Sequence, residues 1–244
     1  IVGLEHHDPT DVIVVISKPP AKEVRDEVVA LLQKCTKPVV AIFLGEKPEN
    51  HEGKVYLAHT LEETARMAVD LANGDPVKDN YCDPIDYEVS RPLAADKTVK
   101  GLYSGGSLAA EAGMLIAEAL NLGGLIKEEG YILKTGGYEV VDLGDDVYTQ
   151  GKPHPMIDPE VRIKKILECA KDPQTGVILL DCMLGYGCHP DMAGALAPAI
   201  RESQEIAKAD GRELYFVASV CGTRQDPQDY DRAVAELKEC GVLV

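Results

Sequence analysis

The residues best suited to chemistry form a short cluster that follows an apolar run in the second half of the chain. The sequence GYGCHPD at residues 185–191 holds two glycines, an aromatic ring, a thiol, an imidazole and a carboxylate. An imidazole can act as a general acid or base, or donate a hydrogen bond to an anionic oxygen. We therefore predict that His189 is catalytic and that Gly185, Tyr186 and Gly187 bind the anionic part of a substrate. The alternative is that His-Pro-Asp only ends a strand and caps a helix.

A second candidate is the turn Ser104-Gly105-Gly106-Ser107, which lies between a strand-like and a helix-like run. Glycines let the backbone approach a ligand closely, and the N–H groups at a helix start favour phosphate or carboxylate. We predict that all four residues bind phosphate or another anion. The turn is not a Walker loop, because GxxxxGK[ST] does not occur in the sequence. A tight turn with a serine cap is the alternative.

A third candidate is the sequence CGTRQDP at residues 221–227, which again follows an apolar run. Arg224 is predicted to be catalytic by holding an anion, with Gly222 and Thr223 contributing to anion binding. A solvated arginine beside an Asp-Pro turn explains the sequence equally well. No metal site is expected, because no histidine lies in HExxH or another metal-ligand spacing.

The elements that position these residues alternate between strand-like and helix-like patterns. Apolar runs without alternation predict strands buried on both faces, and strands of this kind joined through helices form parallel sheets. Because ligands gather at the carboxyl ends of strands in such sheets, the three candidate turns belong to one expected site. The strands are expected at 11–17, 39–44, 99–103, 176–184, 213–220 and 241–244, with a β-rich excursion at 131–143. The helices are expected at 24–35, 61–73, 108–120, 158–170, 195–210 and 229–240.

Two helix starts carry specific signals. Thr60 and Glu63 form a capping box ahead of the helix at 61–73, and Gly74 is placed to end that helix. Asp158-Pro159 combines an N-cap with a proline in the first helical position.

The chain is expected to form two lobes of similar layout, at residues 1–75 and 99–244. Residues 76–98 are rich in proline and charge and lack apolar periodicity, which is typical of a linker between domains. The predicted fold class is therefore α/β, with two open parallel-sheet lobes.

Composition excludes several classes of function. A formal net charge of −16 argues against nucleic acid as a partner, because phosphate backbones recruit Lys and Arg. The seven cysteines form no CxxC pair, which favours a reducing compartment over disulfides or structural zinc. The longest apolar runs are far shorter than a membrane span. We expect a cytoplasmic protein with no membrane contact.

Three motifs give the chain a family resemblance. GLYSGGSLAAEA (101–112), VILLDCMLGYGCHPDMAGALAPAI (177–200) and SVCGTRQDPQ (219–228) closely resemble FdrA proteins, which are similar to the α-subunit of succinyl-CoA synthetase. The resemblance implies two flavodoxin-like ligase lobes preceded by a CoA-binding Rossmann lobe. Since the chain begins at Ile1 without a methionine, we expect that lobe to lie upstream of it.

The resemblance also implies three possible functions. FdrA-like proteins look like subunits of the oxamate carbamoyltransferase of anaerobic allantoin breakdown, part of purine catabolism, which implies handling of an acyl or carbamoyl phosphate. The second hypothesis is an NDP-forming acyl-CoA ligase of the succinyl-CoA type, and the third is a non-catalytic assembly subunit. Succinyl-CoA synthetase relatives use a phosphohistidine in a GHAG-like loop; no GHAG occurs here, so His189 does not inherit that role.

The same resemblance implies the ligands and partners. CoA, ATP or ADP, and phosphate are expected as substrates, with no covalently bound cofactor. The expected partners are the small-molecule substrate and either other enzyme subunits or a second copy of the chain.

Overall fold

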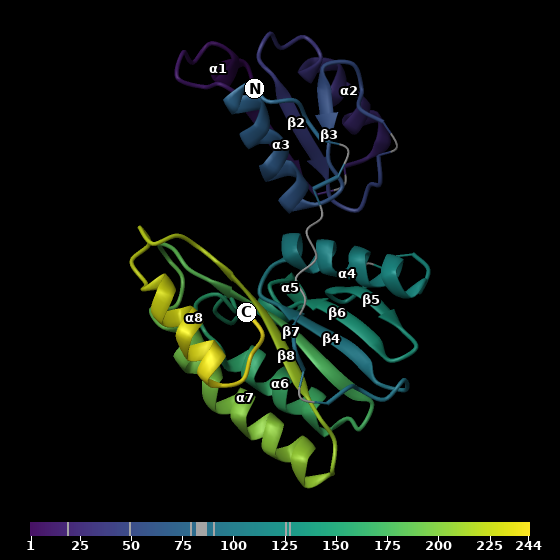
Figure 1. The fold of residues 1–244 in the computed structure, drawn as a ribbon, viewed down its shortest axis with the longest axis vertical. Coiled ribbons are helices and arrows are strands. Elements are labelled where there is room, and N and C mark those ends of the chain that lie inside the picture. Colours follow the sequence, from purple (N-terminus) through teal and green to yellow (C-terminus); the bar gives the residue numbers. More distant parts are fainter. Residues whose placement is uncertain are drawn as a thin grey trace. The chain divides into compact units, whose positions relative to one another are not determined.

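The protein is described from a computed structural model that covers residues 1–18, 20–48, 50–78, 80–81, 87–89, 91–124, 126 and 128–244. The chain divides into two compact units, residues 1–86 and 87–244. Figure 1 shows the first unit in purple and blue and the second in teal, green and yellow.

The first unit contains a parallel sheet of three strands in the order β1-β2-β3. These are β1 (Ile13–Ser17), β2 (Val39–Phe43) and β3 (Val55–Leu57). Helix α2 (Lys22–Leu32) joins a core cluster with all three strands through Val29 and Leu32, and α3 (Leu61–Asn73) contacts β2 and β1. Every residue of β2 is buried, as expected for a strand covered on both faces. A short helix, α1 (Val2–Glu5), precedes the sheet.

Strand β1 corrects one expectation. The run at 11–17 was predicted to be buried on both faces, but Val14 is 40% exposed and Ile16 is 57% exposed. The reason is that β1 is the edge strand of the described sheet, so its alternate side chains are covered on one face only. A continuous apolar run therefore does not distinguish a central strand from an edge strand.

The predicted helix signals around α3 are confirmed. Thr60 Oγ1 accepts the N–H of Glu63 at 3.0 Å, and Glu63 Oε2 accepts the N–H of His59 at 2.6 Å. Gly74 ends the helix with a φ of 76°, a left-handed conformation that glycine adopts without a steric penalty.

The second unit contains a sheet of five strands in the order β5-β6-β4-β7-β8. The bounds are β4 (Thr98–Tyr103), β5 (Tyr131–Thr135), β6 (Tyr138–Asp142), β7 (Thr175–Met183) and β8 (Tyr215–Cys221). All pairs are parallel except β5 with β6. The four parallel strands thus follow the flavodoxin-like arrangement, in which the first strand lies between the second and the third. The predicted α/β fold class with open, mainly parallel sheets is confirmed.

Helices cover both faces of this second sheet (Figure 1). Helix α4 (Gly106–Leu120) packs on one face, where Ala109 and Ala117 meet Leu133 and Val140. The opposite face is covered by α6 (Glu160–Lys171), α7 (Met192–Ala209) and α8 (Tyr230–Glu239), which share one large apolar cluster with β7 and β8. A one-turn helix, α5 (Asp146–Thr149), follows β6.

Some element boundaries differ from the expectations for physical reasons. Helix α7 begins at Met192, before the expected 195, because Asp191 Oδ1 accepts the N–H of Gly194 at 3.1 Å. Helix α6 begins at Glu160 with Pro159 as its N-cap, two residues after the expected start, and the predicted cap Asp158 still accepts the N–H of Glu160 at 2.9 Å. The strand expected at 241–244 is only a single bridge between Leu243 and Val217.

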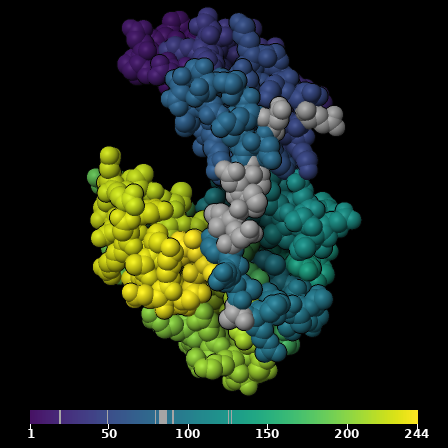
Figure 2. Space-filling model, viewed as in Figure 1, coloured from purple at the N-terminus to yellow at the C-terminus, as the bar shows by residue number. Residues whose placement is uncertain are grey.

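The ends of the predicted linker contact different units. Tyr81 is buried in the first unit, and its hydroxyl donates to Asp70 Oδ2 at 2.9 Å. In the second unit Arg91 exchanges two hydrogen bonds with the hydroxyl of Tyr215. Figure 2 shows the blue residues that begin the second unit beside its yellow C-terminal residues. Residues 79, 82–86 and 90 of the predicted linker lie outside the described residues, and the linker itself stays a prediction.

Within the described part of the chain, every helix is too short or too polar to cross a bilayer.

Candidate functional site

The candidate site lies where the connections of the second sheet change direction. Strand β4 is followed by α4 on one face of the sheet, and its neighbour β7 is followed by α7 on the opposite face. In open α/β sheets such a topological switch point leaves a crevice beyond the carboxyl ends of the strands. The turns at 104–107 and 184–191 leave β4 and β7 at this edge, and the 222–228 turn leaves β8 at the same edge.

Ser104 is fully buried, and its polar groups are used inside the protein. Both carboxylate oxygens of Asp181, on β7, accept the N–H of Ser104 at 2.9 and 3.0 Å, and Oδ2 also accepts its hydroxyl at 2.6 Å. A carboxylate thus occupies the donors that were expected to bind a substrate anion. The prediction for Ser104 is corrected accordingly: it anchors the turn, and anion binding would have to come from the residues that follow.

Asp181 is held in turn by Arg162, the third residue of α6. The Nη2 of Arg162 donates to Asp181 Oδ1 at 2.8 Å and to the Asp181 carbonyl at 2.5 Å. Both side chains are 1% exposed. The other two nitrogens of Arg162, Nε and Nη1, are buried and have no hydrogen-bond partner among the described residues. This ion pair was not predicted from the sequence.

The remaining residues of the 104–107 turn begin α4. Gly105 is the N-cap in an extended conformation, and no side chain caps the helix there. The first N–H groups of a helix have no partner within it, and they attract negative charge. Gly105, Gly106 and Ser107 therefore keep the geometry expected of an anion-binding turn.

The loop after β7 is only partly available to a ligand. The side chain of Gln228 makes three hydrogen bonds with the backbone of this loop. Its Oε1 accepts the Gly185 N–H at 2.9 Å, and its Nε2 donates to the carbonyls of Gly185 and His189. Tyr186 is 91% exposed. Gly187 has a φ of 84° and no neighbour where a Cβ would stand, so it shapes the turn.

His189 has its ring fixed by the backbone. Its Nδ1 accepts the N–H of Asp191 at 3.0 Å, so the proton of the neutral ring is on Nε2. Its own N–H donates to the Met156 carbonyl at 2.7 Å, which attaches this loop to the segment before α6. His189 is half-buried and can present an Nε2–H donor.

His154, on the segment between α5 and α6, was also not predicted from the sequence. Its Nδ1 accepts the N–H of Met156 at 3.2 Å, so Nε2 again holds the proton. A Cβ placed on Gly144 would lie 2.6 Å from His154 Nε2 and 2.6 Å from the Ser104 carbonyl oxygen. His154 therefore lies beside the turn that follows β4. The signal for this was weak, since His154 follows no strand.

The 222–228 turn is also occupied by the protein's own side chains. Asp226 Oδ2 accepts the N–H of Thr223 at 2.5 Å. A Cβ on Gly222 would lie 2.6 Å from the Cβ of Leu184, so Gly222 permits close contact of two loops. Arg224 makes two 2.9 Å hydrogen bonds with Asp231, and both side chains are largely exposed. The Arg224 hydrogen bond lowers the pKa of Asp231.

Burial sets the chemistry of the other groups at this edge. Desolvation raises the pKa of Cys182, beside Asp181, to about 11, and it also raises the pKa of Cys188. Desolvation and the charge of Asp181 raise the pKa of Tyr103 far above its usual range. These groups stay protonated at neutral pH, so neither thiol is a ready nucleophile. No group of three or more metal-ligating side chains occurs among the described residues.

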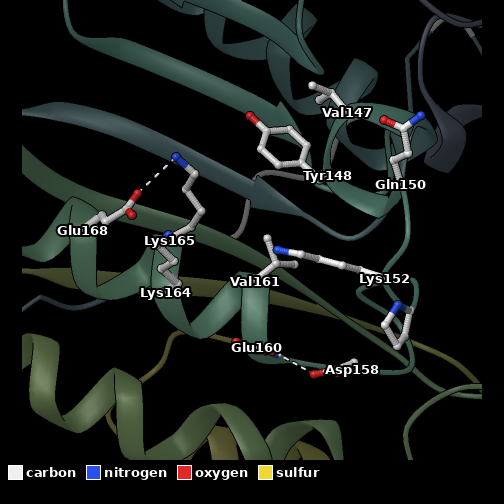
Figure 3. A pocket seen from close by; sticks show the side chains of 11 residues that line it. Val147, Tyr148, Gln150, Lys152, Asp158, Glu160, Val161, Lys164, Lys165 and Glu168 are labelled. Carbon is white, nitrogen blue, oxygen red and sulfur yellow. Dashed lines mark hydrogen bonds and ion pairs between the residues drawn. The ribbon is translucent and has the colours of Figure 1, made fainter.

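A cavity of about 450 Å³ lies between the segment that follows the carboxyl end of β6 and the first turns of α6. Figure 3 shows Tyr148 and Val147 on one side and Val161 of α6 on the other, with Lys152 extending between them and Lys165 turned to Glu168. The Lys165–Glu168 pair spans 3.1 Å. None of the predicted site residues lines this cavity.

Comparison with known proteins gives two results. Residues 102–244 match the family model described as CoA-ligase. The chain is also similar to "Uncharacterized protein YahF" of Escherichia coli (strain K12), with 36% identity over 261 residues. That alignment covers 100% of this chain and 50% of the relative, so the chain spans half of the relative's length.

Proposed function

The chain belongs to the CoA-ligase family, and on that premise we propose that its second unit binds an acyl phosphate or carbamoyl phosphate at the β4–β7 switch point. The observation that carries the proposal is the N-terminus of α4, which starts at this point without a side-chain cap. The residues proposed to bind the phosphoryl group are Gly105, Gly106 and Ser107, through their backbone N–H groups.

The two histidines supply the second part of the proposed chemistry. His189 and His154 each accept a backbone N–H at Nδ1, so each can donate from Nε2. A donor of this kind can stabilise the negative charge that develops on the substrate oxygen when a nucleophile attacks the acyl carbon. In the exchange reaction the nucleophile is inorganic phosphate: one of its oxygens forms the new bond to the acyl carbon, and the original phosphate leaves with the electron pair of the broken C–O bond. In this tautomer Nε2 carries the proton, so it can donate a hydrogen bond but has no free lone pair to accept a phosphoryl group.

A more specific version of the proposal comes from the FdrA resemblance. It assigns the chain to a subunit of an oxamate carbamoyltransferase-type enzyme in allantoin and purine catabolism, with phosphate as co-substrate. Its support is the three motifs quoted above, and the match to the CoA-ligase family supports only the broader class.

The alternative is NDP-forming acyl-CoA ligation with ATP or ADP and CoA, which the family description favours. Incubation of the full-length protein with labelled ATP would then give an acid-labile phosphoprotein. A non-catalytic subunit is the third candidate, because Asp181, Gln228 and Asp226 already occupy three of the loop N–H groups.

The test is isotope exchange between labelled phosphate and either acetyl phosphate or carbamoyl phosphate, measured on the full-length protein with its partner subunits. Substitution His189→Ala should lower the exchange rate about 100-fold, which is typical of losing one oxyanion donor. The matched control is Lys208→Gln, on the exposed side of α7. If H189A exchanges phosphate as fast as the wild-type protein, the role of His189 is refuted. If the wild-type protein shows no exchange at all, the proposed reaction is refuted.

A further inference from the structure

The buried pair of Arg162 and Asp181 is hydrogen-bonded to the residue that precedes the proposed anion site. Asp181 accepts hydrogen bonds from the N–H and hydroxyl of Ser104, the residue that precedes the α4 turn. Arg162 donates to the same carboxylate at 2.8 Å. One carboxylate thus links α6, β7 and the end of β4.

Stability alone does not explain this pair. Two charges with 1% exposed side chains have lost nearly all their hydration, and well-packed apolar residues can often replace such a pair without loss. Arg162 is also incompletely satisfied, since only one of its three nitrogens has a hydrogen-bond partner among the described residues. Buried groups of this kind call for an explanation.

The charge of Asp181 supplies that explanation. A carboxylate bonded to Ser104 lies one residue from the N–H groups proposed to bind phosphate, and it would repel a phosphate there. Arg162 places a positive charge against that carboxylate and removes the repulsion. The same contact fixes the carboxylate and, through it, the position of Ser104.

We propose that Arg162 is a positioning and charge-compensating residue for the α4 anion site, and that it makes Asp181 compatible with a bound phosphoryl group. The inference rests on the proposed function, because it requires an anion at Gly105–Ser107. It leads to an asymmetry. Removing Arg162 leaves an unpaired negative charge near the ligand, whereas neutralising Asp181 leaves a positive one.

The experiment is a titration of the full-length protein with inorganic phosphate and, separately, with acetyl phosphate, monitored by the amide NMR signals of Gly105, Gly106 and Ser107. Substitution Arg162→Met should weaken binding about tenfold or more. Substitution Asp181→Asn keeps an oxygen that can accept the Ser104 N–H, so it should keep the affinity within about threefold or tighten it. The double variant R162M/D181N should also stay within about threefold of wild type, because the charge to be compensated is gone.

The matched control is Arg212→Met. The side chain of Arg212 is also largely buried, but it donates to the Ala170 carbonyl near the end of α6 and contacts the Thr175 carbonyl where β7 begins. Its loss should leave phosphate affinity unchanged.

The outcomes separate the two proposals. Absence of phosphate-induced shifts at these amides in wild type would refute the proposed function and the inference with it. If phosphate binds the wild-type protein and its affinity falls equally in R162M and D181N, the pair has only a structural role. That result would overturn this inference and leave the proposed function standing. If R162M does not fold, a tenfold loss of phosphate affinity in D181N or in the double variant would overturn this inference instead.

Discussion

Substitution of Gly144 by alanine should disturb the candidate site from its centre. The new Cβ would lie 2.6 Å from the Ser104 carbonyl oxygen, 2.6 Å from His154 Nε2 and 3.1 Å from Asp142 Oδ1. Real Cβ contacts below 3.0 Å essentially never occur, so at least two of these atoms must move. His154 is a side chain and can rotate, but the Ser104 carbonyl is backbone and belongs to the turn before α4.

The cost follows from this geometry. Inserting one methyl group into a well-packed region typically destabilises a protein by about 1–3 kcal/mol. We expect G144A to fall in the upper half of that range, because a backbone atom is one of the obstacles. The displaced turn should also bind phosphate more weakly.

The assay is native-state hydrogen exchange of the β7 amides, which reports the free energy of opening of the second unit. The matched control is Gly124→Ala, where a Cβ meets nothing within 4 Å. Both variants replace glycine by alanine and therefore restrict the unfolded chain to a similar extent. The difference between their free energies of opening thus reports the steric clash. If G144A and G124A differ by less than about 0.5 kcal/mol, the contact geometry around Gly144 is refuted.

Four further predictions concern other parts of the chain. In the same hydrogen-exchange assay R162M should lower the free energy of opening of the second unit by about 3–5 kcal/mol, because it leaves the Asp181 charge buried and unpaired. The double variant R162M/D181N should lower it by less, and an equal loss in the two variants would contradict this expectation. Alkylation of the native protein at pH 8, followed by mass spectrometry, should modify exposed Cys221 before Cys169 and Cys182. Desolvation raises the pKa of Cys221 too, but it raises the pKa of Cys169 and of Cys182 to about 11, and Cys182 is buried; early labelling of Cys182 would count against its burial. An NMR titration should find the pKa of Asp231 below its ordinary value of 3.8, and R224Q should raise it. Since the folded pKa is lowered, this pair stabilises the protein above the ordinary carboxyl pKa and loses its effect as pH falls through the lowered one. Substitution Thr60→Ala should cost about 1 kcal/mol of first-unit stability, measured by hydrogen exchange of α3, because Glu63 loses its N-cap acceptor; no change would show that the cap is dispensable.

Sequence signals predicted the elements of the fold where local chemistry decides the outcome. The capping box of Thr60 with Glu63 and the terminal Gly74 placed α3 correctly, since both act within one helical turn. Strand β3 was missed because it has only three residues and depends on its neighbour β2 for support. The exposed face of β1 was missed because edge position is a property of the whole sheet.

The site was harder to predict because its central contact joins residues far apart in sequence. Arg162 lies at helical spacing with Ile166 and Ala170, on the buried face of α6, and Asp181 interrupts the apolar run of β7. Two opposite charges inside apolar patterns were therefore visible, but only the tertiary structure brings them together. The same holds for Ser104, whose type and spacing suggested a ligand and whose donors meet Asp181 instead.

An arginine side chain that is largely shielded from solvent contacts strand β7 near each of its ends. Arg212 binds the Thr175 carbonyl where the strand begins, and Arg162 binds Asp181 near where it ends. Sliding this strand against β4 or β8 would break contacts at two distant points at once, so its register is expected to stay constant. On the proposed function, motion that admits or releases a ligand is then expected in the loops that follow Tyr103 and Met183, while the strand beneath them serves as a fixed support.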